Sequence, residues 1–195
     1  MAAELETIHF DSVRTLRAWL EANHESSPGI RVRMAKKGTG IATIDWDELV
    51  DEGLCWGWID SQRRPLDETY FVQRFTPRTK RSKWSKINTE RVSRLVAAKR
   101  MRPAGLHQVD LAKADGRWDA AYEGSKVADV PDDLQAALDA SPAAAEAFAG
   151  LDRTNRYAIL YRIGSVKKPE TRARKITGFV EMLERGETVH PRSRK

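Results

Sequence analysis

The sequence predicts an α+β fold, in which a small mixed half with about three strands, residues 1–88, packs with an all-helical half, residues 89–186. Segments with alternating apolar residues, or with many aromatic and β-branched residues, lie before Pro77. Beyond Pro77 the apolar residues recur at helical spacing. The 195 residues fit one domain or two fused halves, which we expect to form one cooperative unit with a flexible tail over residues 187–195.

The first elements that we expect are a helix and a strand. Asp11 is a candidate N-cap for a helix whose apolar residues lie at helical spacing, and turn-forming residues at 26–29 end it. In the segment that follows, Ile30, Val32 and Met34 alternate with arginines. This alternation is typical of a strand with one buried face.

A second helix and two further strands complete the first half. Asp45 and Glu48 have the spacing of a capping box, which predicts a helix start at this point. Residues 56–59 and 69–75 are rich in aromatic and β-branched side chains. We therefore expect two strands, joined by a polar turn that contains Pro65.

Prolines and glycines divide the second half into helices. Asn88 is a candidate N-cap for the first helix, which must end before the next proline. Proline is tolerated in the first turn of a helix, and glycine commonly follows its last turn. These rules place helix starts at Pro103, Pro131, Pro142 and Pro169, and helix ends at Gly116, Gly164 and Gly186.

Several familiar chemistries lack their signatures in this sequence. The single cysteine, Cys55, has apolar neighbours, the four histidines have no metal-ligand spacing, and there is no nucleophile elbow or phosphate-binding loop. We therefore expect no metal and no cofactor, and we assign no catalytic residue. The acidic N-terminus does not resemble an export signal, and no apolar run approaches the ~18 residues of a membrane helix. These features favour a cytoplasmic protein without membrane insertion.

Positive charge is concentrated in two segments. Residues 63–102 contain thirteen Lys and Arg against three acids, and residues 153–175 contain eight against Glu170 alone, within a chain of net charge +6. Such asymmetry predicts a positive face for phosphates, carboxylates or an acidic partner. The alternative is that these charges are spread around helices as solvated faces.

The segment from Trp56 to Asn88 is the best candidate for a functional surface. Asp60 follows an expected strand and is a candidate general base or ligand-binding group; the alternative is a structural salt bridge or turn with Arg63 and Arg64.

The later part of this segment combines arginines, hydroxyls and an indole just before an expected helix start. Such a combination can receive a phosphate or carboxylate, because arginine offers paired donors and a helix start offers free N–H groups. Alternatively, Trp84 anchors the segment on the core while the cations remain in water. The candidate ligand-binding residues are Asp60, Arg74, Arg78, Arg81, Trp84 and Asn88.

Several motifs together resemble the YdeI/OmpD-associated family, also called bacteriocin-protection proteins. They lie at residues 57–60, 70–78, 82–88, 101–106, 116–119, 155–160 and 169–174. The match extends from about Ile30 to Gly186. The resemblance implies a bacterial accessory protein linked to tolerance of bacteriocins or antimicrobial peptides, with some relatives associated with a porin or the periplasm. It implies no reaction and transfers no catalytic residue.

These observations favour a non-catalytic stress or resistance protein that binds an anionic small molecule or a protein partner through its basic, aromatic surface. One alternative is a nucleic-acid-binding protein, suggested by the basic stretches and stacking aromatic rings; no recognised nucleic-acid-binding motif supports it. Another is an enzyme for a phosphorylated or carboxylated small molecule, with Asp60 as acid or base and nearby arginines as anion clamps.

Overall fold

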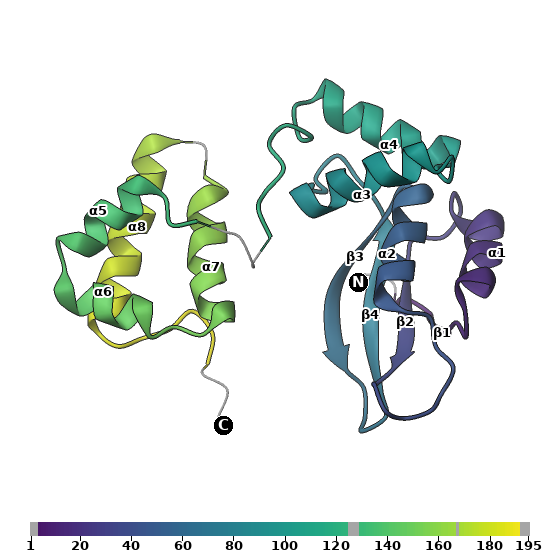
Figure 1. The fold of residues 1–195 in the computed structure, drawn as a ribbon, viewed down its shortest axis with the longest axis horizontal. Coiled ribbons are helices and arrows are strands. Elements are labelled where there is room, and N and C mark those ends of the chain that lie inside the picture. The colour runs from purple at the N-terminus through teal and green to yellow at the C-terminus, as the bar shows by residue number, and fades with distance from the viewer. Residues whose placement is uncertain (1–3, 125–128, 167, 192–195) are drawn as a thin grey trace. The chain divides into compact units, whose positions relative to one another are not determined.

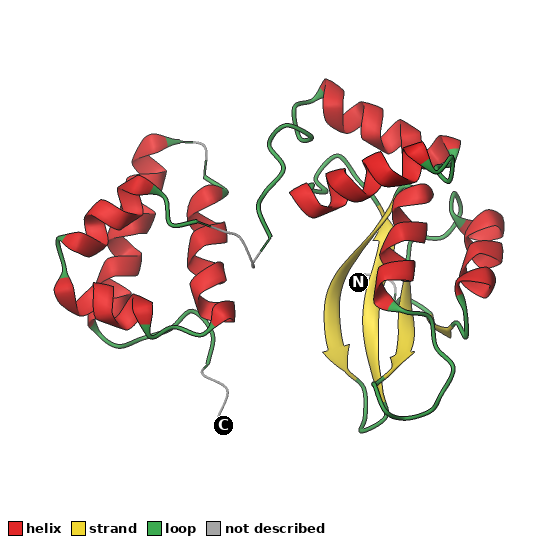
Figure 2. Ribbon diagram, in the orientation of Figure 1, coloured by secondary structure: helices red, strands yellow, loops and turns green. Residues whose placement is uncertain are grey.

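The chain forms two compact units. The computed structural model describes residues 4–124, 129–166 and 168–191. Unit 1, Met1–Ala121, contains in its described residues a four-stranded sheet and four helices, and unit 2, Tyr122–Lys195, contains four helices in its described residues (Figures 1 and 2). This arrangement confirms the α+β class.

The helices and strands have the following bounds. The strands are β1 Thr7–His9, β2 Ile30–Ala35, β3 Trp58–Pro65 and β4 Tyr70–Pro77. The helices of unit 1 are α1 Val13–Asn23, α2 Trp46–Cys55, α3 Lys86–Ala97 and α4 Pro103–Ala114. The helices of unit 2 are α5 Asp132–Asp139, α6 Pro142–Ala149, α7 Arg153–Gly164 and α8 Pro169–Glu184.

The sheet has the strand order β1-β2-β4-β3, with β1 parallel to β2 and the other pairs antiparallel. We expected about three strands, and β1 is the additional one; at three residues it is too short to show alternation in the sequence. Pro65 is the last residue of β3 and does not lie in the turn that follows. This position suits proline, because β3 is an edge strand and its end needs no ladder donor.

One face of the sheet forms the core of unit 1. Ile30, Val32 and Met34 of β2 lie opposite Phe75, Gln73 and Phe71 of β4, and all six side chains are buried. The apolar members of this set belong to one hydrophobic cluster with residues of α1 and α2, which pack on this face (Figure 1). The arginines between these positions, which include Arg31 and Arg74, therefore project from the opposite face.

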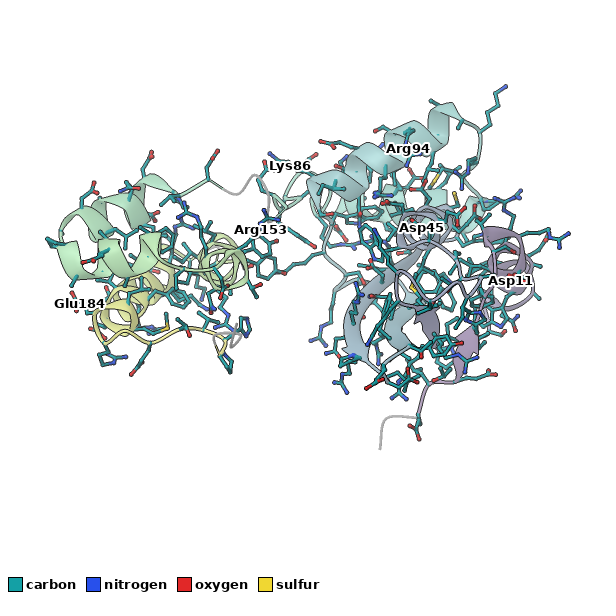
Figure 3. The ribbon with its side chains drawn as sticks, turned by 60° about the horizontal axis from the view of Figure 1, so that its bottom comes forward. Asp11, Asp45, Lys86, Arg94, Arg153 and Glu184 are labelled. Carbon is teal, nitrogen blue, oxygen red and sulfur yellow. The ribbon has the colours of Figure 1, made fainter. Side chains whose placement is uncertain are left out.

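The helix starts follow local capping chemistry, with two corrections. The capping box of Asp45 and Glu48 at α2 is confirmed. Asp11 does not cap α1; Ser12 is the N-cap, and the Asp11 carboxylate accepts the hydroxyls of Ser12 and Thr15 (Figure 3 labels Asp11 and Asp45).

Asn88 does not cap α3 either. Ser85 is the N-cap, and its hydroxyl accepts the backbone N–H of Asn88 at 3.2 Å. The helix therefore begins about one turn earlier than expected, because the Ser85 hydroxyl accepts a backbone N–H of the first turn. The proline starts at α4, α6 and α8 are confirmed, whereas Pro131 is the N-cap residue of α5.

The two compact units divide after Ala121, not at residue 88. The reason is packing: residues of α3 and α4, including Leu95 and Ala112, belong to the same hydrophobic cluster as the sheet. Gly105 brings α4 close to the end of α2, since a Cβ at this position would lie 2.2 Å from the carbonyl oxygen of Cys55. The helices after the sheet thus belong to two different cores.

Unit 2 has its own core, in which buried residues from α5 to α8 form a second hydrophobic cluster. The segment after α8 joins it, because Val189 packs against this cluster and the His190 backbone N–H donates to the buried Asn155 side chain at 2.8 Å. Residues 187–191 of the expected flexible tail therefore hold defined contacts. The remainder of that tail, 192–195, lies outside the described residues.

Two consecutive carboxylates on α2 are buried and bound by arginines. Asp51 accepts hydrogen bonds from Arg91 and Arg94 of α3, at 3.0 and 2.9 Å (Figure 3 labels Arg94). Glu52 accepts from Arg17 of α1 at 2.7 Å and from Arg100 at 2.6 Å. We call these six residues the α2 ion network. Three arginines of the basic segment 63–102 are thus paired with buried carboxylates, although the side chains of Arg94 and Arg100 remain partly exposed.

Burial alone would raise the pKa of Glu52, but the hydrogen bonds from Arg17 and Arg100 outweigh it and hold that pKa below its ordinary value. The carboxylate therefore stays ionised in the folded protein at neutral pH. Its charge contributes to stability only while these arginines remain in place.

A glycine pair tests the packing of α4 on α2. Gly105→Ala is expected to destabilise unit 1 by about 1–3 kcal/mol, because the new methyl group meets backbone atoms that cannot move separately. Gly178→Ala in α8 is the matched control; a Cβ at this position would have nothing within 4 Å, so the change should stabilise unit 2 by about 0.5–1 kcal/mol. Calorimetric unfolding of both variants measures these effects. An equal change in the free energy of unfolding of the two variants would contradict the close approach of α4 to the end of α2.

The α2 ion network predicts a pH-dependent stability. Glu52→Gln should destabilise unit 1 by about 3 kcal/mol at neutral pH, since it removes the buried partner of Arg17 and Arg100. Because the folded state lowers the pKa of Glu52, its contribution is complete above the unfolded pKa and is lost as pH falls through the folded pKa.

The difference in unfolding free energy between wild type and Glu52→Gln should therefore shrink on acidification. Urea unfolding over a pH series measures it, with the exposed Glu21→Gln, which makes the same charge change, as control. A difference that is the same at every pH would show that Glu52 is not held ionised by its arginines.

Candidate functional site

Two of the candidate ligand-binding residues, Arg78 and Trp84, lie against each other. The Arg78 guanidinium stacks on the Trp84 ring at 3.6 Å and donates to the Lys83 carbonyl at 3.2 Å. The Trp84 ring also packs against Trp118, with centroids 5.0 Å apart. Arg78 is 5% exposed and Trp84 is 2% exposed, so both hold the segment on unit 1.

The other four candidates come from other parts of unit 1, and the positive charge of Arg78 acts on the Asp60 carboxylate. Arg74 is exposed on the uncovered face of the sheet, and Arg81 is exposed in the loop before α3. Asn88 lies in the first turn of α3, where its backbone binds Ser85. Asp60 lies on β3. Of the six residues, the described contacts join only Arg78 and Trp84 directly.

Asp60 is held by uncharged partners. Its carboxylate accepts the Trp46 indole N–H at 3.2 Å and the Gln73 amide at 3.4 Å. Burial raises its pKa, and the Trp46 hydrogen bond opposes that shift. The expected salt bridge is absent among the described residues: Arg63 lies over the Phe71 ring and Arg64 donates to Gln62, because the bulge between Asp60 and Arg63 turns these side chains away.

A pocket of about 570 Å³ lies where four segments of unit 1 meet, and we call it the α4 pocket. Its walls come from the end of α1, the turn between α2 and β3, the end of β4 and the first turns of α4. Gly57 makes the turn possible, since its φ of +74° is strained for other residues and a Cβ would meet the Ala104 carbonyl at 3.0 Å. The lining residues are His24, Glu25, Trp56, Gly57, Trp58, Pro77, Arg78, Arg102, Pro103, Ala104, His107 and Gln108.

Positively charged groups lie at this pocket. Arg102 is the N-cap residue of α4 and Pro103 its first residue, so no side chain caps the helix and its N-terminal end faces the lining residues. A helix N-terminus carries a partial positive charge. The exposed Arg102 adds a cation, and the described lining residues contain one carboxylate, that of Glu25.

Trp56 lines this pocket with a buried indole. It is 8% exposed, and its indole N–H has no hydrogen-bond partner among the residues that the structure describes. The Arg102 guanidinium lies 5.5 Å from the Trp56 ring centre, and the His24 ring packs on the same indole at 4.6 Å. The pocket thus combines an unused buried donor, an exposed cation and an uncapped helix, which is a suitable environment for a phosphate or carboxylate.

Of the expected site residues, only Arg78 lines this pocket. Arg102 and Trp56 were not among the expected site residues, although the sequence contains one feature that points to Arg102. Pro103 was expected to open a helix, and the residue before it, Arg102, has no oxygen to cap the free N–H groups. An uncapped helix start preceded by arginine is a local pattern that predicts affinity for anions.

Unit 2 contains a second pocket, of about 480 Å³, along α7 (Figure 3 labels Arg153). Arg153, Arg162 and His190 line it together with Tyr157 and Tyr161. The Tyr157 hydroxyl donates to the Glu123 carbonyl at 3.2 Å, and burial raises its pKa to about 12. The Tyr157 phenol is therefore protonated at neutral pH, and its hydroxyl hydrogen is donated to the Glu123 carbonyl.

The described residues were also searched for a reactive thiol, a metal site and a membrane-spanning helix. Burial raises the pKa of the Cys55 thiol to about 11, so this cysteine is a protonated core residue at neutral pH. No cluster of three or more His, Cys, Asp or Glu side chains suited to a metal occurs in the described ranges. No helix within those ranges is long and apolar enough to cross a membrane.

Two family models match the chain. A domain of unknown function, DUF8412, matches residues 8–108, which is more than half of the chain. The model for bacteriocin-protection, YdeI or OmpD-associated proteins matches residues 127–186, a shorter range than the resemblance from about Ile30 suggested. Searches of curated proteins and of solved structures find no match. The chain therefore belongs to the DUF8412 family and carries a bacteriocin-protection, YdeI or OmpD-associated domain in unit 2.

Proposed function

We propose that this protein is a non-catalytic bacterial accessory factor that contributes to protection against bacteriocins or antimicrobial peptides and binds an anionic small molecule in the α4 pocket. The name of the family matched by unit 2 supports the protective role. The observation that carries the binding role is the unpartnered, nine-tenths buried indole N–H of Trp56 beside Arg102 and the uncapped start of α4.

The dimensions and chemistry of the pocket suit a small molecule. Its volume lies within the roughly 300–1,000 Å³ of typical ligand pockets, and aromatic residues supply much of its lining. An anionic group near Ala104 would accept free N–H groups of α4 and pair with Arg102, while the Trp56 indole would donate from the side. The other faces of the ligand would contact Trp58, Pro77 and Pro103.

The lining supports binding more than catalysis. Its described residues include no serine, threonine, cysteine or lysine that would act as a nucleophile. Asp60, the expected acid or base of an enzyme, is not part of the lining. A cytoplasmic location belongs to the same proposal, and the free buried thiol of Cys55 is compatible with a reducing compartment.

Binding is tested with two variants of the pocket and a matched control. Orthophosphate, citrate and ADP serve as probes in calorimetric titrations of the full chain. Trp56→Phe keeps an aromatic ring but removes the N–H, and Arg102→Gln removes the exposed cation. Each should weaken binding of the preferred probe by about 10- to 100-fold, as expected for a hydrogen bond to a charged group.

The control for this experiment is Arg81→Gln, which makes the same charge change as Arg102→Gln at an exposed position outside the pocket. It should leave the affinity within about twofold. The assignment of the α4 pocket fails if all three variants bind equally, or if none of the probes binds the wild-type protein.

Protection is tested separately, in cells that lack the endogenous gene and carry each variant. Arg102→Gln should reduce survival under bacteriocin challenge to the level without the protein, whereas Arg81→Gln should retain full protection. Arg78 and Trp84 are unsuitable for this purpose, because both are buried and their loss would damage the fold. Protection by a folded Arg102→Gln variant that no longer binds the probe would separate the pocket from the protective role.

A further inference from the structure

The sheet of unit 1 has a second face, which its helices do not cover. The core cluster joins α1 and α2 to the other face only, and side chains on the second face are half-buried or exposed, except that of Ala35, which is buried. The strand register and the alternation of side chains define this open sheet face. Its members are Thr7, His9, Arg31, Arg33, Ala35, Ile59, Arg64, Tyr70, Val72, Arg74 and Thr76.

Four arginines gather on the open sheet face. Arg31 and Arg74 lie directly opposite each other on β2 and β4, while Arg33 and Arg64 lie on either side of Val72. Neighbouring strands are about 4.8 Å apart, so these cations come from three adjacent strands over a short distance. Like charges directly opposite each other destabilise a strand pair. The sheet itself gains no stability from this arrangement.

The charge of the open sheet face is largely uncompensated within the described residues. None of its strand positions is an acid. Arg31 pairs with Glu4 at 3.2 Å, but the Glu4 side chain is 85% exposed, so this pair is weak and easily exchanged. Arg33 packs over the Tyr70 ring at 4.9 Å, and its Nε is buried with no acceptor among the described residues. In the α2 ion network, by contrast, each arginine has a carboxylate.

We infer that the open sheet face binds single-stranded nucleic acid, with the four arginines on phosphates and Tyr70 as a stacking plane for a base. A β-sheet with exposed aromatic and cationic side chains offers both contacts that unpaired nucleotides use. The His9 ring packs edge-on against Tyr70 with ring centroids 6.1 Å apart, and the Arg33 guanidinium lies over the Tyr70 ring. Tyr70 is therefore held in a fixed orientation.

Duplex DNA and anionic membranes fit this face less well. The grooves of a duplex admit a helix or a two-stranded ribbon, whereas this face spans four strands. A membrane-surface site needs large apolar side chains that enter the headgroup region, and the face contains no Trp, Phe or Leu. A single strand can follow the sheet surface and stack a base without either requirement.

The test uses the full chain and fluorescently labelled oligo(dT) and oligo(U), with binding followed by anisotropy over a salt series. Arg31→Gln/Arg74→Gln removes two phosphate partners. It should weaken binding by about tenfold or more at low salt. It should also reduce the magnitude of the slope of log K against log salt by about 1.4, because each of the two lost phosphate contacts contributes roughly 0.7. Tyr70→Leu should weaken binding by about tenfold with an unchanged slope.

The matched control is Arg14→Gln/Lys80→Gln, which makes the same charge change at exposed positions on α1 and in the loop after β4. It should keep both affinity and slope, as should Arg102→Gln in the α4 pocket, which separates this inference from the proposed function. Thermal unfolding of every variant checks the fold.

Three results would overturn the inference. The first is the absence of salt-dependent binding of either oligonucleotide. The second is equal loss of affinity in the sheet variant and the matched control. The third is binding to vesicles containing phosphatidylglycerol, or to duplex DNA, that is tighter than binding to both single strands and is lost in the same variant.

Discussion

The position of α2 depends on two charges buried side by side. Consecutive residues on a helix point about 100° apart, so Asp51 and Glu52 face different neighbours. Asp51 binds arginines of α3, and Glu52 binds α1 and the segment that follows α3. The rotation of α2 about its own axis is fixed in this way. Because breaking a buried ion pair costs several kcal/mol, a slip of this helix is strongly disfavoured.

The same network places the α4 pocket. Arg100, which binds Glu52, lies two residues before Arg102 and three before the start of α4. The chain must turn sharply at this point, and Lys99 adopts a φ of +54°, unusual for a residue other than glycine. Gly105 then permits α4 to rest on the carbonyl groups at the end of α2. The position of the α4 start therefore depends on the buried carboxylate of Glu52, which binds Arg100.

Local chemistry was predictable from the sequence, whereas the distribution of arginines was not. The capping box at Asp45 and the proline starts of α4, α6 and α8 depend on residues within one turn and are confirmed, whereas the caps expected at Asp11 and Asn88 are Ser12 and Ser85. Arg74, Arg78 and Arg91 look alike in sequence, yet one is exposed, one is stacked on Trp84 and one is paired with Asp51. The contacts of each arginine depend on which element its side chain faces in the folded protein. The α4 pocket was missed for the same reason, because its walls come from four separated segments.

The division after Ala121 coincides with the break between the two family matches, at residues 8–108 and 127–186. Each unit keeps its own hydrophobic cluster, and no buried residue belongs to both within the described chain. A genetic exchange just after Ala121 would therefore join two complete cores without cutting either one. Each module has its own family match and its own core, so a change on the surface of one leaves the packing of the other intact.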